Sequence, residues 1–106
     1  MAEPADRLTK LRGMLERQPG DTFLLYAIAL EHKKAGDTAS AIEYLDRTIQ
    51  FDAGHAYAHF QKGQIFEMAG DVDAARQAYQ AGVVAAQSKG DAHALSELQG
   101  ALQMLD

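Results

Sequence analysis

Ala35-Gly36-Asp37 recurs 34 residues further along the chain as Ala69-Gly70-Asp71. The residues around this tripeptide recur at the same offset: Ala29 matches Gly63, Ala41 matches Ala75, Leu45 matches Tyr79 and Ile49 matches Val83. A fixed offset of this size indicates that one supersecondary unit is repeated and stacked. The sequence therefore predicts a repeat protein.

The spacing of apolar residues predicts six helices and no strand. The chain has only two prolines, and its long alanine-rich stretches have helical rather than alternating periodicity. In the first helix, Leu8, Leu11 and Leu15 form one apolar stripe. This helix should end near Gln18, because Pro19 disfavours helical geometry in the residue before it.

Aspartates and glycines mark the remaining helix boundaries. Asp21 can cap a helix over about residues 22–34, because its carboxylate accepts hydrogen bonds from the unpaired amides of the first turn. Gly36 can adopt the left-handed conformation that ends this helix, and Asp37 or Thr38 can cap the next one. Turns this short place successive helices antiparallel, as helical hairpins. The same signals recur later in the chain, at residues 70–71 and 90–91.

Length and composition indicate one domain over residues 1–106. The chain has 47% apolar and 24% charged residues, which is ordinary for a domain with a buried core. Its formal charge of −5 argues against a nucleic-acid partner, which would require clustered lysine and arginine. No apolar run approaches the ~18 residues of a membrane span, and the opening segment lacks the apolar core of a secretory signal. With no cysteine, a disulfide framework is excluded, and we expect a cytoplasmic protein.

The spacing resembles the tetratricopeptide repeat, a motif of large, small and aromatic residues at fixed intervals. The small residues matter because two helices approach closely only where a side chain is missing. Trp at the first motif position and Pro at the last are replaced in both units, and Lys62 stands where Leu is usual. The motif positions are Leu25, Ile28, Ala29, His32, Ala41, Leu45 and Thr48 in the first unit, and His59, Lys62, Gly63, Phe66, Ala75, Tyr79 and Gly82 in the second.

This resemblance implies an all-α fold of antiparallel helical hairpins, stacked as a right-handed superhelix of about six helices. The terminal helices should cap the array, because an unpaired repeat would leave an apolar face in water. The expected parts are a half repeat that resembles the second helix of the motif at 4–18, a first repeat at 22–52, a second at 56–88 and a capping helix at 91–105.

The resemblance also implies a binding surface, since the first helix of each repeat lines the concave side, where segments of partner proteins bind. Two aromatic positions recur on this side: Phe23 matches Tyr57, and Tyr26 matches Phe60. Aromatic residues are enriched at binding hot spots. The alternative is that a terminal helix covers part of the groove and makes these rings ordinary core. The groove residues expected by register are Phe23, Tyr26, Leu30, Lys33, Lys34, Tyr57, Phe60, Gln64, Glu67 and Met68.

Chaperone-binding members of the family carry a clamp of Lys, Asn and Arg for a carboxylate at the end of a chain. This sequence has Tyr26 and Leu30 at the Lys and Asn positions of the first helix, and Tyr57 and Gln61 at two others. Capture of a chaperone tail is therefore disfavoured.

The histidines offer the one arrangement of chemical interest. His55 and His59 have the i, i+4 spacing that can place two imidazoles on a metal. No cysteine or HExxH pattern accompanies them, and His59 fills a packing position of the motif, so packing is the favoured interpretation. We read His32 as a partly buried substitute for the aromatic residue of the motif. No nucleophile, base and acid set occurs, so we expect neither an enzyme nor a cofactor or metal.

Two functions therefore follow from the sequence. The first is a non-enzymatic protein–protein interaction module that binds a peptide or helical segment of a partner in the aromatic groove. The second is a module for homo-oligomerisation through the groove or the last helix. That helix carries a stripe of Leu95, Leu98, Leu102 and Leu105.

Overall fold

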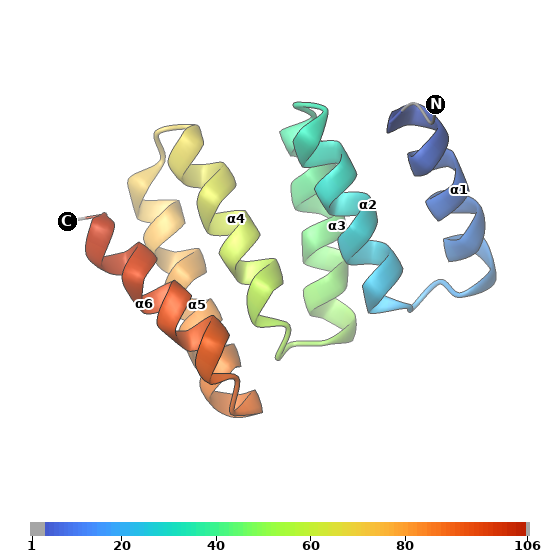
Figure 1. The fold of residues 1–106 in the computed structure, drawn as a ribbon. Helices are drawn as coiled ribbons and strands as arrows, with labels where there is room; N and C mark the ends of the chain where they lie inside the picture. The colour runs from blue at the N-terminus through green and yellow to red at the C-terminus, as the bar shows by residue number, and fades with distance from the viewer. Residues whose placement is uncertain (1–3, 106) are drawn as a thin grey trace. The chain divides into compact units, whose positions relative to one another are not determined.

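The computed structural model describes residues 4–105, which form six α-helices and no strand (Figure 1). This confirms the all-α fold and the number of helices expected from the sequence. Residues 1–3 and 106 of the predicted domain lie outside the described residues. The helices are α1 (Pro4–Arg17), α2 (Thr22–Lys34), α3 (Thr38–Phe51), α4 (Ala56–Met68), α5 (Val72–Lys89) and α6 (Ala92–Met104).

Helix ends follow the aspartate and glycine signals. Asp21, Asp37, Asp71 and Asp91 each accept a hydrogen bond from the backbone N–H three residues later, at 3.0–3.2 Å. This bond satisfies a donor that the helix itself leaves unpaired. Glycines with φ of 84°, 81° and 67° follow α2, α4 and α5, and the left-handed region costs glycine least. These three glycines are Gly36, Gly70 and Gly90.

The chain divides into two compact units, residues 1–51 and residues 52–106. In the first unit, α2 and α3 form an antiparallel hairpin and α1 packs against α2 (Figure 1). In the second, α4 and α5 form the hairpin, and α6 packs against α5 and touches α4 (Figure 1). The division falls at the end of the first predicted repeat. That both units belong to one domain stays a prediction.

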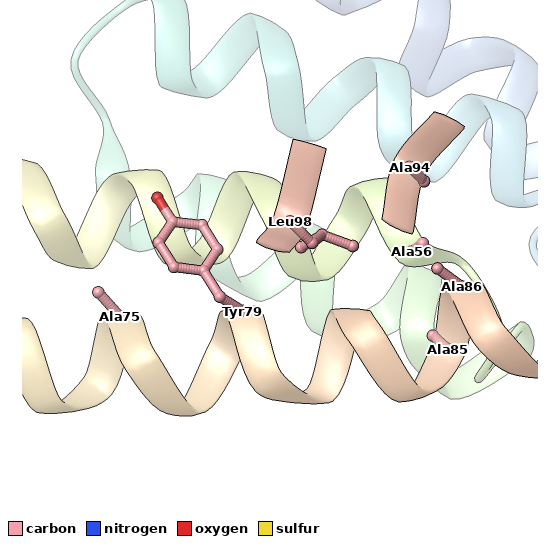
Figure 2. Close-up of a cluster of buried hydrophobic side chains, with 7 residues drawn as sticks. All are labelled: Ala56, Ala75, Tyr79, Ala85, Ala86, Ala94 and Leu98. Carbon is pink, nitrogen blue, oxygen red and sulfur yellow. The ribbon is translucent and has the colours of Figure 1, made fainter. Parts of the chain in front are cut away.

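Small residues lie where the hairpin helices approach. In the second unit, a Cβ atom on Gly63 of α4 would lie 2.7 Å from Cζ of Tyr79 and closer still to other atoms of the ring. Figure 2 shows this ring extending from α5 toward α4. Tyr79 is 1% exposed, so the space left by the missing side chain is filled by its ring. In the first unit, Ala29 and Ala41 are fully buried.

Gly82 of α5 has the same role toward two neighbours at once. A Cβ atom there would lie 2.6 Å from Cδ2 of Leu98 on α6 and 3.1 Å from Cβ of His59 on α4. Leu98 is 1% exposed and belongs, with Ala94, to the buried cluster of this unit (Figure 2). The other leucines of the α6 stripe, Leu95, Leu102 and Leu105, pack against the same cluster.

Two arginines connect α1 to buried polar residues of α2. Arg7 Nε lies 3.2 Å from Oε1 of Glu31, whose side chain is only 10% exposed. Arg12 Nη2 lies 3.3 Å from Nε2 of His32. The apolar stripe of α1 is therefore accompanied by polar contacts that give two buried side chains of α2 their partners.

His32 is more deeply buried than the sequence indicated, at 5% exposure. Its ring stacks on Tyr44 with centroids 5.6 Å apart and planes 20° from parallel. Because a guanidinium only donates, Nε2 of His32 must accept from Arg12, which assigns the ring proton to Nδ1. Nδ1 lies 3.6 Å from Oδ2 of Asp37. The imidazole therefore fills the position of the expected aromatic residue, and it also contacts two polar side chains, Arg12 and Asp37.

We predict that Gly63→Ala destabilises the protein by ~1–3 kcal/mol, because the added methyl group overlaps the Tyr79 ring. Gly100 of α6 is the matched control, since a Cβ atom there meets nothing within 4 Å. Gly100→Ala should stabilise by ~0.5–1 kcal/mol through helix propensity alone. Urea unfolding followed by circular dichroism measures both. Equal effects of the two substitutions would contradict the close approach at Gly63.

Candidate functional site

A hollow of about 510 Å³ lies on the surface of the second unit. It is formed by residues from α4, α5 and α6, so it exists only because the last helix packs beside the hairpin. Its lining residues are Phe60, Gln64, Glu67, Met68, Tyr79, Ala101 and Met104.

Helical spacing places the four α4 residues of this lining on one face. Residues 60, 64, 67 and 68 follow the i, i+4, i+7, i+8 pattern of a helix stripe. Ala101 and Met104 of α6 supply further lining. Met68 and Met104 are 70% and 84% exposed. The hollow therefore presents two flexible thioether side chains to solvent.

A hydrogen bond fixes the one carboxylate of the hollow. The Tyr79 hydroxyl donates to Oε1 of Glu67 at 2.7 Å. Burial of the phenol, followed by this hydrogen bond and the negative charge of Glu67, raises the pKa of Tyr79 well above its usual range. The hydroxyl therefore keeps its proton and remains a donor. The other oxygen of Glu67 has no partner among residues 4–105.

Aromatic rings join the hollow to the core of the unit. Phe60 lies 5.8 Å from Tyr79 between ring centroids, and Tyr57 meets Phe60 edge to face at 6.3 Å. Both Tyr57 and Phe60 are half-buried and pack against the buried cluster. Each ring therefore contributes to stability and keeps part of its surface accessible.

The predicted residues of the first unit lie along α2. Phe23 is 76% exposed, whereas Tyr26 and Leu30 are half-buried. Lys33 is also half-buried, and burial lowers the pKa of its ammonium group. Lys34 is exposed at the end of the helix. The large, exposed ring of Phe23 is therefore available for contact with another molecule.

Four of the ten predicted groove residues thus come together in one hollow, namely Phe60, Gln64, Glu67 and Met68. Sequence reasoning missed Tyr79, which we assigned to packing alone, and the two residues from α6. Ala101 and Met104 have i, i+3 spacing and so form a second apolar face beside the leucine stripe. This second face was the signal in the sequence that could have indicated a contribution of the last helix to the site.

The predicted histidine pair has a structural explanation at His55. This residue caps α4, because its Nδ1 accepts a hydrogen bond from the N–H of Ala58 at 3.1 Å. It occupies the position that Asp21 holds 34 residues earlier, so the repeat itself predicts a cap here. Burial lowers the pKa of the His55 imidazole. No group of three or more His, Asp or Glu residues within the described part of the chain could hold a metal ion.

A second hollow, of about 330 Å³, lies in the first unit. The Arg47 guanidinium lies 4.8 Å above the centroid of the Tyr44 ring in its wall and also pairs with Glu43 at 3.3 Å. Glu16 lines the same hollow and offsets part of its positive charge. The remaining lining residues are Arg12, Leu15 and Pro19.

Comparison with known proteins identifies the family. The model of the tetratricopeptide repeat matches residues 26–92. A TPR repeat-containing protein of Pseudomonas aeruginosa is 30% identical over 96 residues, which are 91% of each chain. This chain therefore belongs to the tetratricopeptide repeat family, as its spacing indicated. The family is one of protein–protein interaction modules.

Solved structures agree with this assignment. A protein from Bordetella parapertussis superimposes with a TM-score of 0.79 at 28% identity, covering 92% of this chain and 85% of its own. A tetratricopeptide repeat domain protein from Salinibacter ruber gives 0.77 at 28% identity, with 83% and 89% covered. Among the described helices, none is long and apolar enough to cross a membrane.

We predict that the cap at His55 makes the second unit sensitive to mild acid. Because the pKa of His55 is lower in the folded chain than the ordinary ~6.5, the unfolded chain takes up the proton first as the pH falls. The stabilisation is therefore complete above about pH 6.5 and is lost progressively below it. Protonation at Nδ1 also removes the acceptor of a cap that contributes ~1 kcal/mol.

The measurement is urea unfolding at pH 7.5 and 5.5 for the parent and His55→Asn, whose amide oxygen caps without titrating. The variant should lose less stability between the two conditions. Asp52 and Lys89, the charged groups near His55, are kept in both proteins. Identical losses of stability in the parent and the variant would show that His55 does not titrate between these two pH values.

Proposed function

We propose that this chain is a non-enzymatic protein–protein interaction module that binds a peptide or helical segment of a partner protein through residues of α2 and α4. The observation that carries the proposal is the hollow of the second unit, with its half-buried Phe60 and its exposed methionines, Met68 and Met104. The predicted residues of α2, with Phe23 exposed, supply the corresponding face of the first unit.

The chemistry of the hollow suits binding. Methionine side chains are flexible and polarizable, so they adapt to the shape of an apolar ligand. Aromatic rings add contact area at a small entropic cost, which is why they are enriched at binding hot spots. Exposed apolar residues that gather at one place on a small domain commonly mark an interaction surface.

The polar groups of the hollow favour binding over catalysis. They are the amide of Gln64, the carboxylate of Glu67 and the phenol of Tyr79. Because the pKa of Tyr79 is raised, its hydroxyl stays protonated near neutral pH and does not serve as a base. The pair of Glu67 and Tyr79 can therefore position a ligand but offers no activated nucleophile.

Self-association through the leucine stripe of α6 has less support. Leu98 is 1% exposed, and the other three leucines of the stripe pack against the buried cluster of their own unit. The stripe is thus already used within one chain. A partner protein on the predicted groove residues is the function favoured by this geometry.

We predict that Met68→Ser combined with Met104→Ser abolishes partner capture while changing the melting temperature little, because both side chains are largely exposed. The matched control is Val84→Ser on α5, whose side chain is 66% exposed and does not line the hollow. The measurement is cross-linked affinity capture from the native cell, with the captured proteins quantified for parent, double variant and control.

The capture should be lost only with the double variant. Unchanged capture by the double variant would contradict binding at the hollow. Sedimentation at increasing protein concentration separates partner binding from self-association, since a dimer lost in the same variant would identify the alternative function.

A further inference from the structure

We propose that the hollow of the second unit accepts a segment of the partner protein in which an apolar side chain lies beside a lysine or arginine. This inference rests on the proposed function, because it specifies the chemistry of the segment that the binding surface recognises.

The position of Glu67 supplies the first argument. It is the one charged residue among the seven that line the hollow. One of its oxygens is held by the Tyr79 hydroxyl at 2.7 Å, while the other has no partner within residues 4–105. A carboxylate that is fixed in place and still open on one side can accept a charge-assisted hydrogen bond from an ammonium or guanidinium group.

The charge of the second unit supplies the next argument. Residues 52–106 contain seven acidic and three basic residues, which gives this unit a net charge of −4 out of the −5 of the whole chain. Lys89 already pairs with Asp52 at 3.2 Å, and Arg76 pairs with Asp73 at 3.2 Å. The third base, Lys62, lines a different hollow beside His59. A basic segment is therefore attracted to this unit, and an acidic one would face an uncompensated carboxylate.

The apolar part of the segment follows from the remaining lining. Phe60, Met68 and Met104 surround the carboxylate with carbon and sulfur. A volume of about 510 Å³ is in the range of small-ligand pockets, so it holds side chains rather than a whole helix. An apolar side chain would cover the methionines, and lower the local dielectric around the ion pair.

The test starts from a displayed library of random 12-residue peptides selected on the full chain. Enriched sequences should place Lys or Arg within four residues of Leu, Met or Phe. One enriched peptide and its Lys→Gln form are then titrated into the labelled protein by NMR. Loss of the cation should weaken binding to the parent by about threefold to tenfold, and the difference should shrink at high salt.

Variants then assign the preference to Glu67. With Glu67→Gln, the two peptides should bind within about twofold of one another, because the ion pair is gone. Tyr79→Phe keeps the ring against Gly63 but removes the hydroxyl that holds Glu67. It should therefore reduce the preference for the Lys peptide over its Lys→Gln form without weakening the binding of the Lys→Gln form. Glu97→Gln on α6 is the matched control, since this exposed carboxylate pairs with His93 and does not line the hollow.

The possible failures are distinguishable. Selection of no peptide at all, or an enriched peptide that shifts no NMR signal of the lining residues, would contradict the proposed function. Enrichment without Lys or Arg, or a Lys preference that survives Glu67→Gln, would overturn this inference alone. Signals of the lining residues that shift with the concentration of the protein itself would identify a second copy as the occupant, and would also overturn it.

Discussion

The contact between Gly63 and Tyr79 is the constraint on which the second unit depends. Helices pack at a distance set by the side chains between them, and close packing leaves few voids. Because Gly63 on α4 has no side chain, there is space for the ring of Tyr79 from α5. The ring fills this space, and Tyr79 is only 1% exposed. Gly82 repeats the arrangement with Leu98 and so fixes α6 against the hairpin.

The same ring connects the fold to the candidate site. The body of Tyr79 belongs to the buried cluster, while its hydroxyl reaches Glu67 at the hollow. The position of that carboxylate is therefore determined by the packing of α5 on α4. Because Met104 and Ala101 come from α6, the hollow also depends on the packing of the last helix, which the sequence presented as a cap or a self-association surface.

The sequence predicted the features that arise from local chemistry. Asp21, Asp71 and Asp91 begin helices as their spacing indicated, and the glycine at residue 63 lies at a close approach, because capping and steric clearance require particular residue types at particular positions. The cap at His55 was missed because histidine is an uncommon capping residue, although the repeat offset pointed to it. The contact of Arg12 with His32 and the hydrogen bond of Tyr79 to Glu67 depend on how helices are rotated against one another, which periodicity alone does not specify.

The double use of Tyr79 limits how this surface can be altered. Its ring cannot be exchanged for a smaller one without opening a void beside Gly63, so sequence drift at this position is restricted by packing. Met68 and Met104 carry no such obligation, because their side chains are 70% and 84% exposed. A redesign of the binding preference can therefore vary these two positions freely while it keeps the phenol of Tyr79 and its acceptor Glu67.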